Sequence, residues 1–121
     1  MREGVRTVAV VEDDPILGPS LVQRFAVEGL TALWWRSGGE ALAGFARHRP
    51  GVVICDIRLP DFDGETLFAK SARLLGGVPF LFITGYGELE QAVRLVRAGA
   101  VDYIAKPFAV DEFVEKVRAL L

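Results

Sequence analysis

Five short apolar, β-rich runs alternate with segments of helical periodicity, and this alternation constrains the fold more than any other feature of the sequence. The runs are Thr7–Val11, Thr31–Trp35, Val52–Cys55, Phe80–Thr84 and Val101–Ala105. Three of them read as continuous apolar segments, which is typical of parallel strands covered by helices on both faces. Since strand–helix–strand connections are right-handed, five strands alternating with five helices predict a doubly wound α/β sheet.

The segments between the runs carry apolar residues at helical spacing. The last stripe consists of Val110, Phe113, Val114, Val117, Leu120 and Leu121. The stripe before it consists of Leu89, Val93 and Val96, and the first consists of Leu17, Leu21 and Phe25. Gly99 predicts the C-terminal cap of the fourth helix. Pro19 would remove a hydrogen bond from the interior of the first helix, so this helix is expected to start near Gly18 or to bend there.

The length of 121 residues suits a single domain, 1–121, and a hydrophobic content of 51% is enough to form a buried core. The net charge of −2 argues against nucleic-acid binding by this chain, which normally requires a basic patch. No apolar run reaches the roughly 18–20 residues of a membrane span, and the stretch MREGVRTVAVVEDDP lacks the pattern of a signal peptide. A single cysteine permits no internal disulfide, and we expect a cytoplasmic protein.

Four of the five predicted strands deliver polar side chains to one edge of the sheet. In doubly wound sheets, ligands bind outside the carboxyl ends of the strands. The side chains at those ends, in strand order, are Glu12, Asp13 and Asp14; Asp56; Thr84; and Lys106. The sequence therefore predicts a binding site at this edge that combines several carboxylates with one hydroxyl and one ammonium group.

This set of side chains suits phosphoryl chemistry. Clustered carboxylates repel one another unless a cation lies among them. Mg²⁺ is favoured, because it binds one or two carboxylates, keeps several waters and accepts phosphate oxygens. Lys106 adds a fixed positive charge and Thr84 a hydroxyl donor, which together would stabilise a transferring phosphoryl group. A carboxylate is a competent nucleophile toward phosphorus and would give an aspartyl phosphate.

Several motifs occur in a specific order: VVEDDP, the apolar run into Asp56 with LPDFDG after it, FITG, and AVDYIAKPF. Together they resemble the receiver domain of two-component response regulators, over essentially the whole chain. The resemblance implies a flavodoxin-like (βα)5 fold, a three-layer sandwich with strand order 2-1-3-4-5. The stretch GYGELEQAVRLVRAGAVDYIAKPF is most similar to receivers of transcriptional activators, including the sigma-54-dependent kind.

The resemblance implies a role for each acid of the predicted site. Asp56 is the expected phosphoacceptor. The expected Mg²⁺ ligands are Asp13, Asp56 and the main-chain carbonyl of Arg58, and Glu12 would act mostly through metal-bound water. This chain has Glu12 where the family pattern has an aspartate, which lengthens the reach of that carboxylate by one methylene. Arg58 and Tyr86 flank the expected site, at positions that tune the rate of dephosphorylation in the family.

The resemblance also implies a switch. Thr84 and Lys106 are expected to contact the phosphoryl oxygens, and Tyr103 occupies the position of an aromatic residue that responds when Thr84 moves. The Lys106–Pro107 peptide bond is expected to be cis, the form that is accessible mainly before proline. These positions are carried over from the family pattern, one residue at a time.

The function that follows from the resemblance is a phospho-accepting signalling domain without multiple-turnover activity on external substrates. A sensor histidine kinase is the expected phosphodonor. Phosphorylation would bias a surface formed by the fourth helix, fifth strand and fifth helix, roughly Glu88 to Leu121. This surface would control homodimerisation and an output domain located C-terminal to this chain, to which DNA binding would belong.

Other functions stay open from the residues alone. A small Mg²⁺-dependent phosphatase or dehalogenase with an aspartate nucleophile typically has a second aspartate two residues further on, where this chain has Arg58. A phosphorylation-independent binding module would not need the acidic, threonine and lysine set. Gly85 to Glu90 half-match a dinucleotide-binding fingerprint, but the charge of Glu90 would disfavour pyrophosphate.

The other acids near the site are interpreted as structural. Asp61 and Asp63 lie in the turn sequence Pro60–Gly64, and Asp63 is expected to cap the helix that follows. Asp14 is expected to cap the first helix rather than to bind metal.

Four further residues are also interpreted as structural. His48 is expected at the surface and is not the phosphodonor histidine. Cys55 is expected in the core, on the opposite face of its strand from Asp56. Trp34 and Trp35 are expected to face opposite sides of an edge strand, with at least one of them partly exposed.

Overall fold

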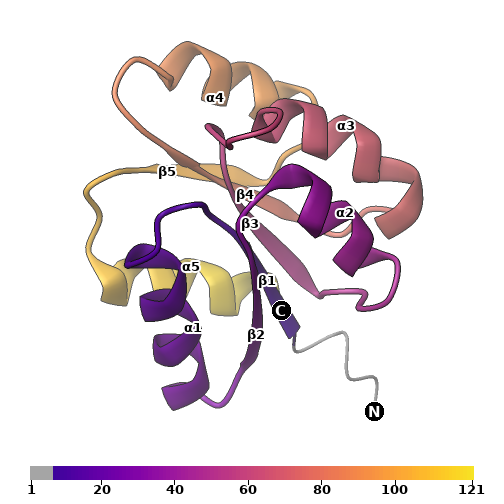
Figure 1. Ribbon diagram of the computed structural model, residues 1–121. Helices are drawn as coiled ribbons and strands as arrows, with labels where there is room; N and C mark the ends of the chain where they lie inside the picture. Colours follow the sequence, from indigo (N-terminus) through magenta and orange to yellow (C-terminus); the bar gives the residue numbers. More distant parts are fainter. Residues whose placement is uncertain (1–6) are drawn as a thin grey trace.

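A computed structural model describes residues 7–121 and shows one parallel five-stranded sheet in the order β2-β1-β3-β4-β5 (Figure 1). The strands are β1 (Thr7–Val11), β2 (Thr31–Trp35), β3 (Val52–Asp56), β4 (Phe80–Thr84) and β5 (Asp102–Ala105). The predicted doubly wound class and strand order are confirmed. The first six residues of the predicted 1–121 domain lie outside the described residues.

Five helices complete three layers, as Figure 1 shows. On one face lie α1 (Leu17–Val27) and α5 (Val110–Leu120); on the other lie α2 (Gly38–Phe45), α3 (Gly64–Leu75) and α4 (Leu89–Arg97). Each face has its own buried apolar cluster between the helices and the sheet. Within the described residues, no helix is long and apolar enough to cross a membrane.

The predicted strand bounds differ from the observed ones by one residue in two places. Strand β3 extends to Asp56, because Asp56 pairs with Ile83 of β4. Strand β5 begins at Asp102 and not at Val101. The residues of β3 and β4 are all buried, and in β1 only Thr7 is partly exposed, as expected for central strands between two helical layers.

The observed start of α1 explains why Pro19 is tolerated in this helix. The helix begins at Leu17, which confirms the predicted late start. Pro19 therefore lies in the first turn, where the lack of a backbone N–H costs little. The N-cap residue of α1 is Ile16 and not the predicted Asp14. The Asp14 carboxylate nevertheless accepts hydrogen bonds from the backbone N–H groups of Ile16 (2.8 Å) and Leu17 (3.2 Å) at the start of the helix.

The apolar stripe predicted for the fourth helix does not form its buried face. Leu89 and Val93 are 57% and 37% exposed, whereas α4 buries Ala92 and Leu95. Glu88, Gln91, Ala92 and Leu95 follow one another at i, i+3, i+4 and i+7 and form the inward face. Half of this face is polar, and a search for apolar periodicity therefore selects the neighbouring, exposed stripe.

The two tryptophans of β2 lie on opposite faces of the sheet and are both partly buried, as predicted. The Trp34 indole N–H donates to the main-chain carbonyl of Glu12, at 2.6 Å. A Cβ atom at Gly18 would lie 2.3 Å from the Trp34 ring, so a glycine is needed where α1 crosses this indole. Trp34 thus connects the edge strand and α1 to the end of β1.

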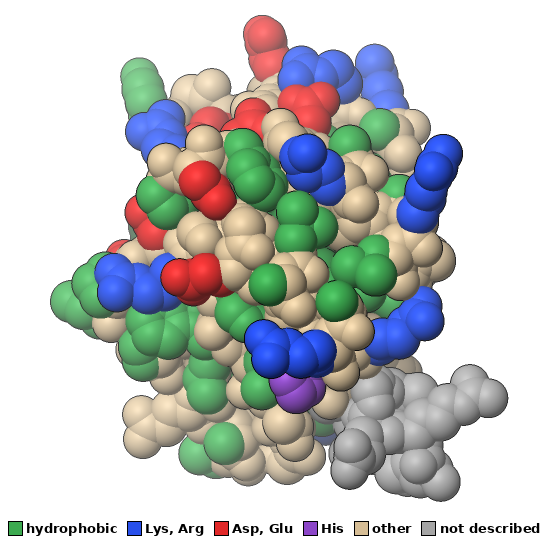
Figure 2. Space-filling view, turned by 45° about the vertical axis from the view of Figure 1, so that its right-hand side comes forward, with side chains coloured by type: hydrophobic (Ala, Val, Ile, Leu, Met, Phe, Trp, Pro, Cys, Tyr) green, Lys and Arg blue, Asp and Glu red, His purple; other side chains and the backbone are tan. Residues whose placement is uncertain are grey.

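Cys55 and His48 also lie where the sequence predicts. Cys55 is fully buried in the cluster beneath α2, α3 and α4, and burial raises the pKa of its thiol. His48 is exposed (Figure 2). Gly99, just after α4, has a φ of +123°, which fits the predicted C-terminal cap.

Candidate functional site

A cavity of about 550 Å³ opens at the carboxyl ends of the strands, where the sequence predicts a site. It lies beside the loops that follow β1, β3, β4 and β5. The charged residues that line it are Glu12, Asp13, Asp14, Asp56, Arg58, Glu88 and Lys106. Five of these seven side chains are acidic, so the cavity is suited to a cation and to groups that a cation can bridge.

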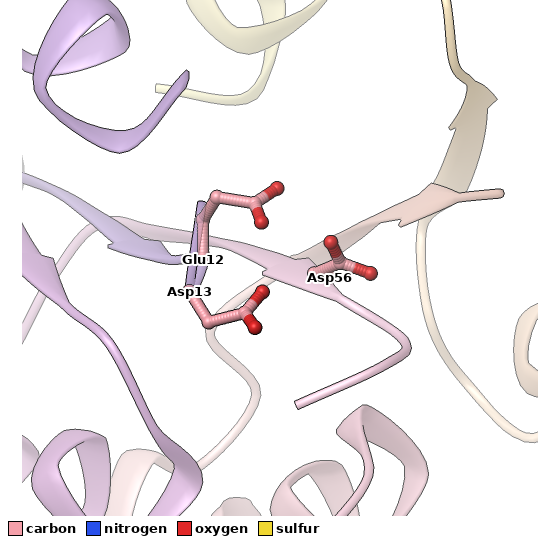
Figure 3. A group of neighbouring side chains, drawn as sticks. All are labelled: Glu12, Asp13 and Asp56. Carbon is pink, nitrogen blue, oxygen red and sulfur yellow. The ribbon is translucent and has the colours of Figure 1, made fainter. Parts of the chain in front are cut away.

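Three carboxylates gather on one side of this cavity. Figure 3 shows Glu12 and Asp13 at the end of β1 and Asp56 at the end of β3, with their carboxylates around a common space. One oxygen from each lies within 4.8 Å of the others. Glu12 is fully buried and Asp56 is 5% exposed, whereas Asp13 is open to solvent. The predicted acidic cluster is thus assembled from two neighbouring strands.

Lys106 is the cation that faces these acids. Its Nζ lies 2.9 Å from Asp56 Oδ2 and 3.1 Å from Glu12 Oε1. The backbone N–H of Lys106 donates to the carbonyl of Thr84 at 2.8 Å, and the Lys106–Pro107 bond is cis, as predicted. The Lys106 ammonium group thus reaches from the end of β5 to the carboxylate at the end of β3.

The electrostatics of the cluster favour the arrival of a further positive charge. Burial raises the pKa of Glu12 to about 7, and the charge of Asp56 acts in the same direction. Burial alone would lower the pKa of Lys106, but the hydrogen bond to Asp56 and its charge raise it on balance. Glu12 Oε1 is near Lys106 Nζ but accepts no hydrogen bond from any residue between 7 and 121. This buried oxygen, together with the other acids, fits a hard divalent cation such as Mg²⁺.

Thr84 and Tyr103 are not among the residues that line the cavity with the carboxylates. Thr84 is 2% exposed and does not line the cavity. It pairs in register with Ala105, whereas Asp56 pairs with Ile83. Tyr103 is partly buried and packs against the apolar cluster beneath α2, α3 and α4. The predicted switch residues therefore lie on adjacent strands, and the phosphoryl contact expected of Thr84 stays a prediction.

Arg58 lies at the rim of the cavity with its side chain 79% exposed. Its backbone N–H donates to Asp56 Oδ1 at 2.9 Å, which places the main chain of Arg58 beside the carboxylate cluster. Its guanidinium group lies 3.3 Å from the carboxylate of Glu88. The sequence analysis did not include Glu88 among the site residues. Its place four residues after Thr84, at the predicted start of a helix that follows a site strand, could have indicated it.

The two turn acids after Asp56 bind backbone N–H groups. Asp63 accepts from the N–H of Thr66 at 3.0 Å and caps α3, as predicted. Asp61 accepts from the N–H groups of Gly38 (2.9 Å) and Gly39 (2.8 Å) at the start of α2. Asp61 was predicted only to shape its own turn, but it also links the loop after β3 to the loop after β2.

The fold and the cavity define an α/β protein with an acidic, lysine-containing site at the carboxyl edge of a flavodoxin-like sheet. The response regulator receiver domain family matches residues 8–118, and the chain belongs to this family. A receiver domain from Methanospirillum hungatei superposes with a TM-score of 0.88 at 32% identity, covering 94% of this chain and 91% of the other. A putative response regulator from Chloroflexus aurantiacus gives 0.86 at 32% identity, covering 95% and 96%.

The curated relatives include larger transcriptional regulators. The C4-dicarboxylate transport transcriptional regulatory protein DctD of Rhizobium meliloti is 39% identical over 112 residues, which cover 93% of this chain and 24% of the relative. The DNA-binding transcriptional regulator NtrC of Salmonella typhimurium is 36% identical over 117 residues, 97% of this chain and 24% of the relative. The chain thus spans about a quarter of the length of these relatives. The resemblance to receivers of sigma-54-dependent activators is confirmed.

Proposed function

We propose that this receiver domain, 1–121, acts in the cytoplasm, accepts a phosphoryl group on Asp56 from a sensor histidine kinase and thereby controls a transcriptional output domain C-terminal to it. The observation that carries the proposal is the position of the Asp56 carboxylate. It is nearly buried, lies 2.9 Å from Lys106 Nζ, and forms a cluster with the carboxylates of Glu12 and Asp13. A nucleophilic carboxylate beside a fixed cation suits attack on an anionic phosphorus centre.

In the proposed transfer, an oxygen of Asp56 attacks the phosphorus of a phosphohistidine in line with the P–N bond. That bond breaks, its electron pair stays on the imidazole nitrogen, and the product is an aspartyl phosphate. Lys106 neutralises charge on the phosphoryl oxygens. Mg²⁺ held by Asp13, Asp56 and the Arg58 carbonyl, with Glu12 acting through water, would supply further positive charge to these oxygens.

The proposed response involves Thr84 and Tyr103. The phosphoryl group carries a charge of about −1.5 to −2, which replaces the single negative charge of the Asp56 carboxylate at the end of β3. Thr84 would turn to donate a hydrogen bond to the phosphoryl group, and Tyr103 would move into the space that Thr84 leaves. This change would bias the surface formed by α4, β5 and α5 toward homodimerisation and output. DNA binding and ATP hydrolysis would belong to the output part, and this domain would not turn over external substrates.

The test is mass spectrometry after incubation with acetyl phosphate and Mg²⁺. The wild-type protein should gain the mass of one phosphoryl group, and Asp56→Asn should gain none. Asp61→Asn is a matched control, because it changes a nearby carboxylate that binds only backbone N–H groups in this structure. Undiminished labelling of Asp56→Asn would show that another residue accepts the group. Repeated hydrolysis of a generic phosphate ester would favour an enzyme instead.

A further inference from the structure

Glu88 is a nearly buried carboxylate in the same cavity as Asp56, and the proposed phosphotransfer does not use it. It is 9% exposed and lies immediately before α4. It is also separate from the three carboxylates that could share a metal ion. A carboxylate that is buried this far is normally held by hydrogen bonds or a counterion, and the contacts of Glu88 indicate what it does.

Two donors at the cavity hold the Glu88 carboxylate. The backbone N–H of Gly85 donates to Oε1 at 2.6 Å, and the Arg58 guanidinium lies 3.3 Å from Oε2. The backbone supports the first contact, because the N–H of Glu88 donates to the carbonyl of Gly85 at 3.3 Å and closes a turn. Gly87 in this turn has a φ of +83°, a conformation that favours glycine.

Both donors also line the cavity that contains Asp56. A phosphoryl group on Asp56 would bring negative charge and strong acceptor oxygens into this space. It would attract Arg58 and the Gly85 N–H, and it would repel the Glu88 carboxylate. The phosphoryl group and Glu88 therefore compete for Arg58 and the Gly85 N–H. Each of them weakens the binding of the other to these two groups.

We propose that Glu88 is a positioning residue that acts as an internal competitor of the phosphoryl group and holds the β4–α4 turn in its unphosphorylated arrangement. This proposal rests on the proposed function of Asp56. When the phosphoryl group arrives, Gly85 and Arg58 turn from Glu88 to the phosphoryl oxygens. The carboxylate of Glu88 then moves out of the cavity, and the first turn of α4 shifts with it.

The packing of α4 allows this movement. The backbone N–H of Ala92 donates to the carbonyl of Glu88 at 3.0 Å, so displacement of Glu88 acts directly on the first turn of the helix. The helix itself buries only two of its side chains, those of Ala92 and Leu95. A charge change in the cavity can thus reach α4 through one residue, without disturbing a large apolar interface.

The experiment uses Glu88→Gln and Glu88→Ala, with Glu90→Gln as the matched control. Glu90 lies two residues further on, is exposed, and loses the same charge in its variant. The probe is beryllofluoride, a mimic of the phosphoryl group, titrated at saturating Mg²⁺. Glu88→Gln should bind it roughly tenfold more tightly, because a charge-assisted competitor is removed. Glu88→Ala should show a larger gain, and Glu90→Gln should bind like the wild type.

A second readout follows the Gly85 N–H directly. In the unliganded protein, Glu88→Gln should move the NMR signal of the Gly85 amide and Glu90→Gln should not. In the wild type, beryllofluoride should move the same signal. An effect that comes only from the lost charge would appear equally in Glu90→Gln, and that result would overturn the proposal. So would unchanged or weaker beryllofluoride binding by Glu88→Gln.

Failure of the proposed function gives a different result. In that case the wild-type protein itself neither binds beryllofluoride nor is labelled by acetyl phosphate. The proposal for Glu88 alone is contradicted if the wild type binds beryllofluoride and is labelled by acetyl phosphate, while both Glu88 variants bind beryllofluoride as tightly as the wild type does.

Discussion

Helices α4 and α5 lie on opposite faces of the sheet, and they differ in how much apolar packing holds them in place. Helix α5 buries Phe113, Val114 and Val117, and the Phe113 ring packs against Phe108 and Phe25 at centroid distances of 4.8 and 6.1 Å. Helix α4 buries two smaller groups, Ala92 and Leu95, and leaves Leu89 and Val93 at the surface.

Polar contacts provide much of the attachment of α4. The Gln91 amide donates to Asp63 (3.1 Å) and to Glu65 (2.9 Å), and Arg94 pairs with Glu65 at 2.8 Å. Both acids belong to the segment that follows Asp56 in the chain.

Helix α5 has ion pairs too, Asp111–Arg24 (2.7 Å), Lys116–Asp102 (2.6 Å) and Arg118–Glu28 (2.9 Å), but it adds them to a large buried apolar face. Charge near Asp56 can therefore act on α4 more readily than on α5, whose apolar packing does not depend on charge.

The largest effect on stability is expected at Phe113, the buried ring of α5. Phe113→Ala should lower the free energy of unfolding by about 3–5 kcal/mol, because it removes a fully buried ring and leaves a cavity. Urea denaturation followed by the tryptophan fluorescence measures this loss. A loss below about 1 kcal/mol would mean that α5 is not held mainly by its apolar face, and the contrast with α4 would disappear.

Acid should distinguish the two helices. Hydrogen bonds from Arg94 and Gln91 lower the pKa of Glu65. Partial burial would raise the pKa of Asp63, but hydrogen bonds, first that from the Thr66 N–H, lower it on balance. A carboxylate with a lowered folded-state pKa stabilises the fold above its unfolded-state value and loses this contribution as the pH falls through the folded-state value.

The pKa values of Glu28 and Asp102, which pair with α5, are lowered as well, so acid also weakens the ion pairs of α5. Because α5 keeps its buried apolar face, we expect the amides of α4 to lose protection from hydrogen exchange below about pH 4, earlier than those of α5. Hydrogen exchange with mass-spectrometric or NMR detection measures both helices in one sample. Equal loss of protection in both helices would contradict a specific polar attachment of α4.

A substitution at neutral pH should reproduce part of the acid effect. Glu65→Gln weakens the contacts of α4 with the start of α3 and should speed exchange in α4 by roughly two- to fivefold, the range expected of a partly exposed ion pair. Exchange in α5 should not change. Glu112→Gln, which removes an exposed charge from α5, is the control. A loss of protection that spreads equally to α5 would show that the pair supports the whole fold.

The smallest effect is expected at the exposed stripe. Leu89→Ser should change the free energy of unfolding by less than about 0.5 kcal/mol, as is usual for surface positions. Leu95→Ala, at a residue that is 1% exposed, should cost about 2–5 kcal/mol. Urea denaturation of both variants decides between the two stripes of α4. Similar losses would mean that Leu89 faces the core, as the apolar periodicity alone would indicate.

Much of the site was predictable because parallel strands present their carboxyl ends at one edge. Once the ends of the strands are known, Asp13, Asp56 and Lys106 must lie near one another. The position of Thr84 was less predictable, since a side chain at the last residue of a strand can face either layer. Glu88 was missed for a related reason: it reaches the cavity only because the turn at Gly87 folds it back toward Gly85.

The sequence by itself determined the alternation of strands and helices, the buried central strands and the acids that end them. These features follow from side-chain periodicity and from the residue types that end strands and cap helices, which are local properties. Only the tertiary structure decided the rotation of α4 about its axis, the use of Asp61 as a cap for α2, and the contact of Arg58 with Glu88. Each of these depends on residues that are distant in the sequence, and their contacts form only when the sheet brings the loops together.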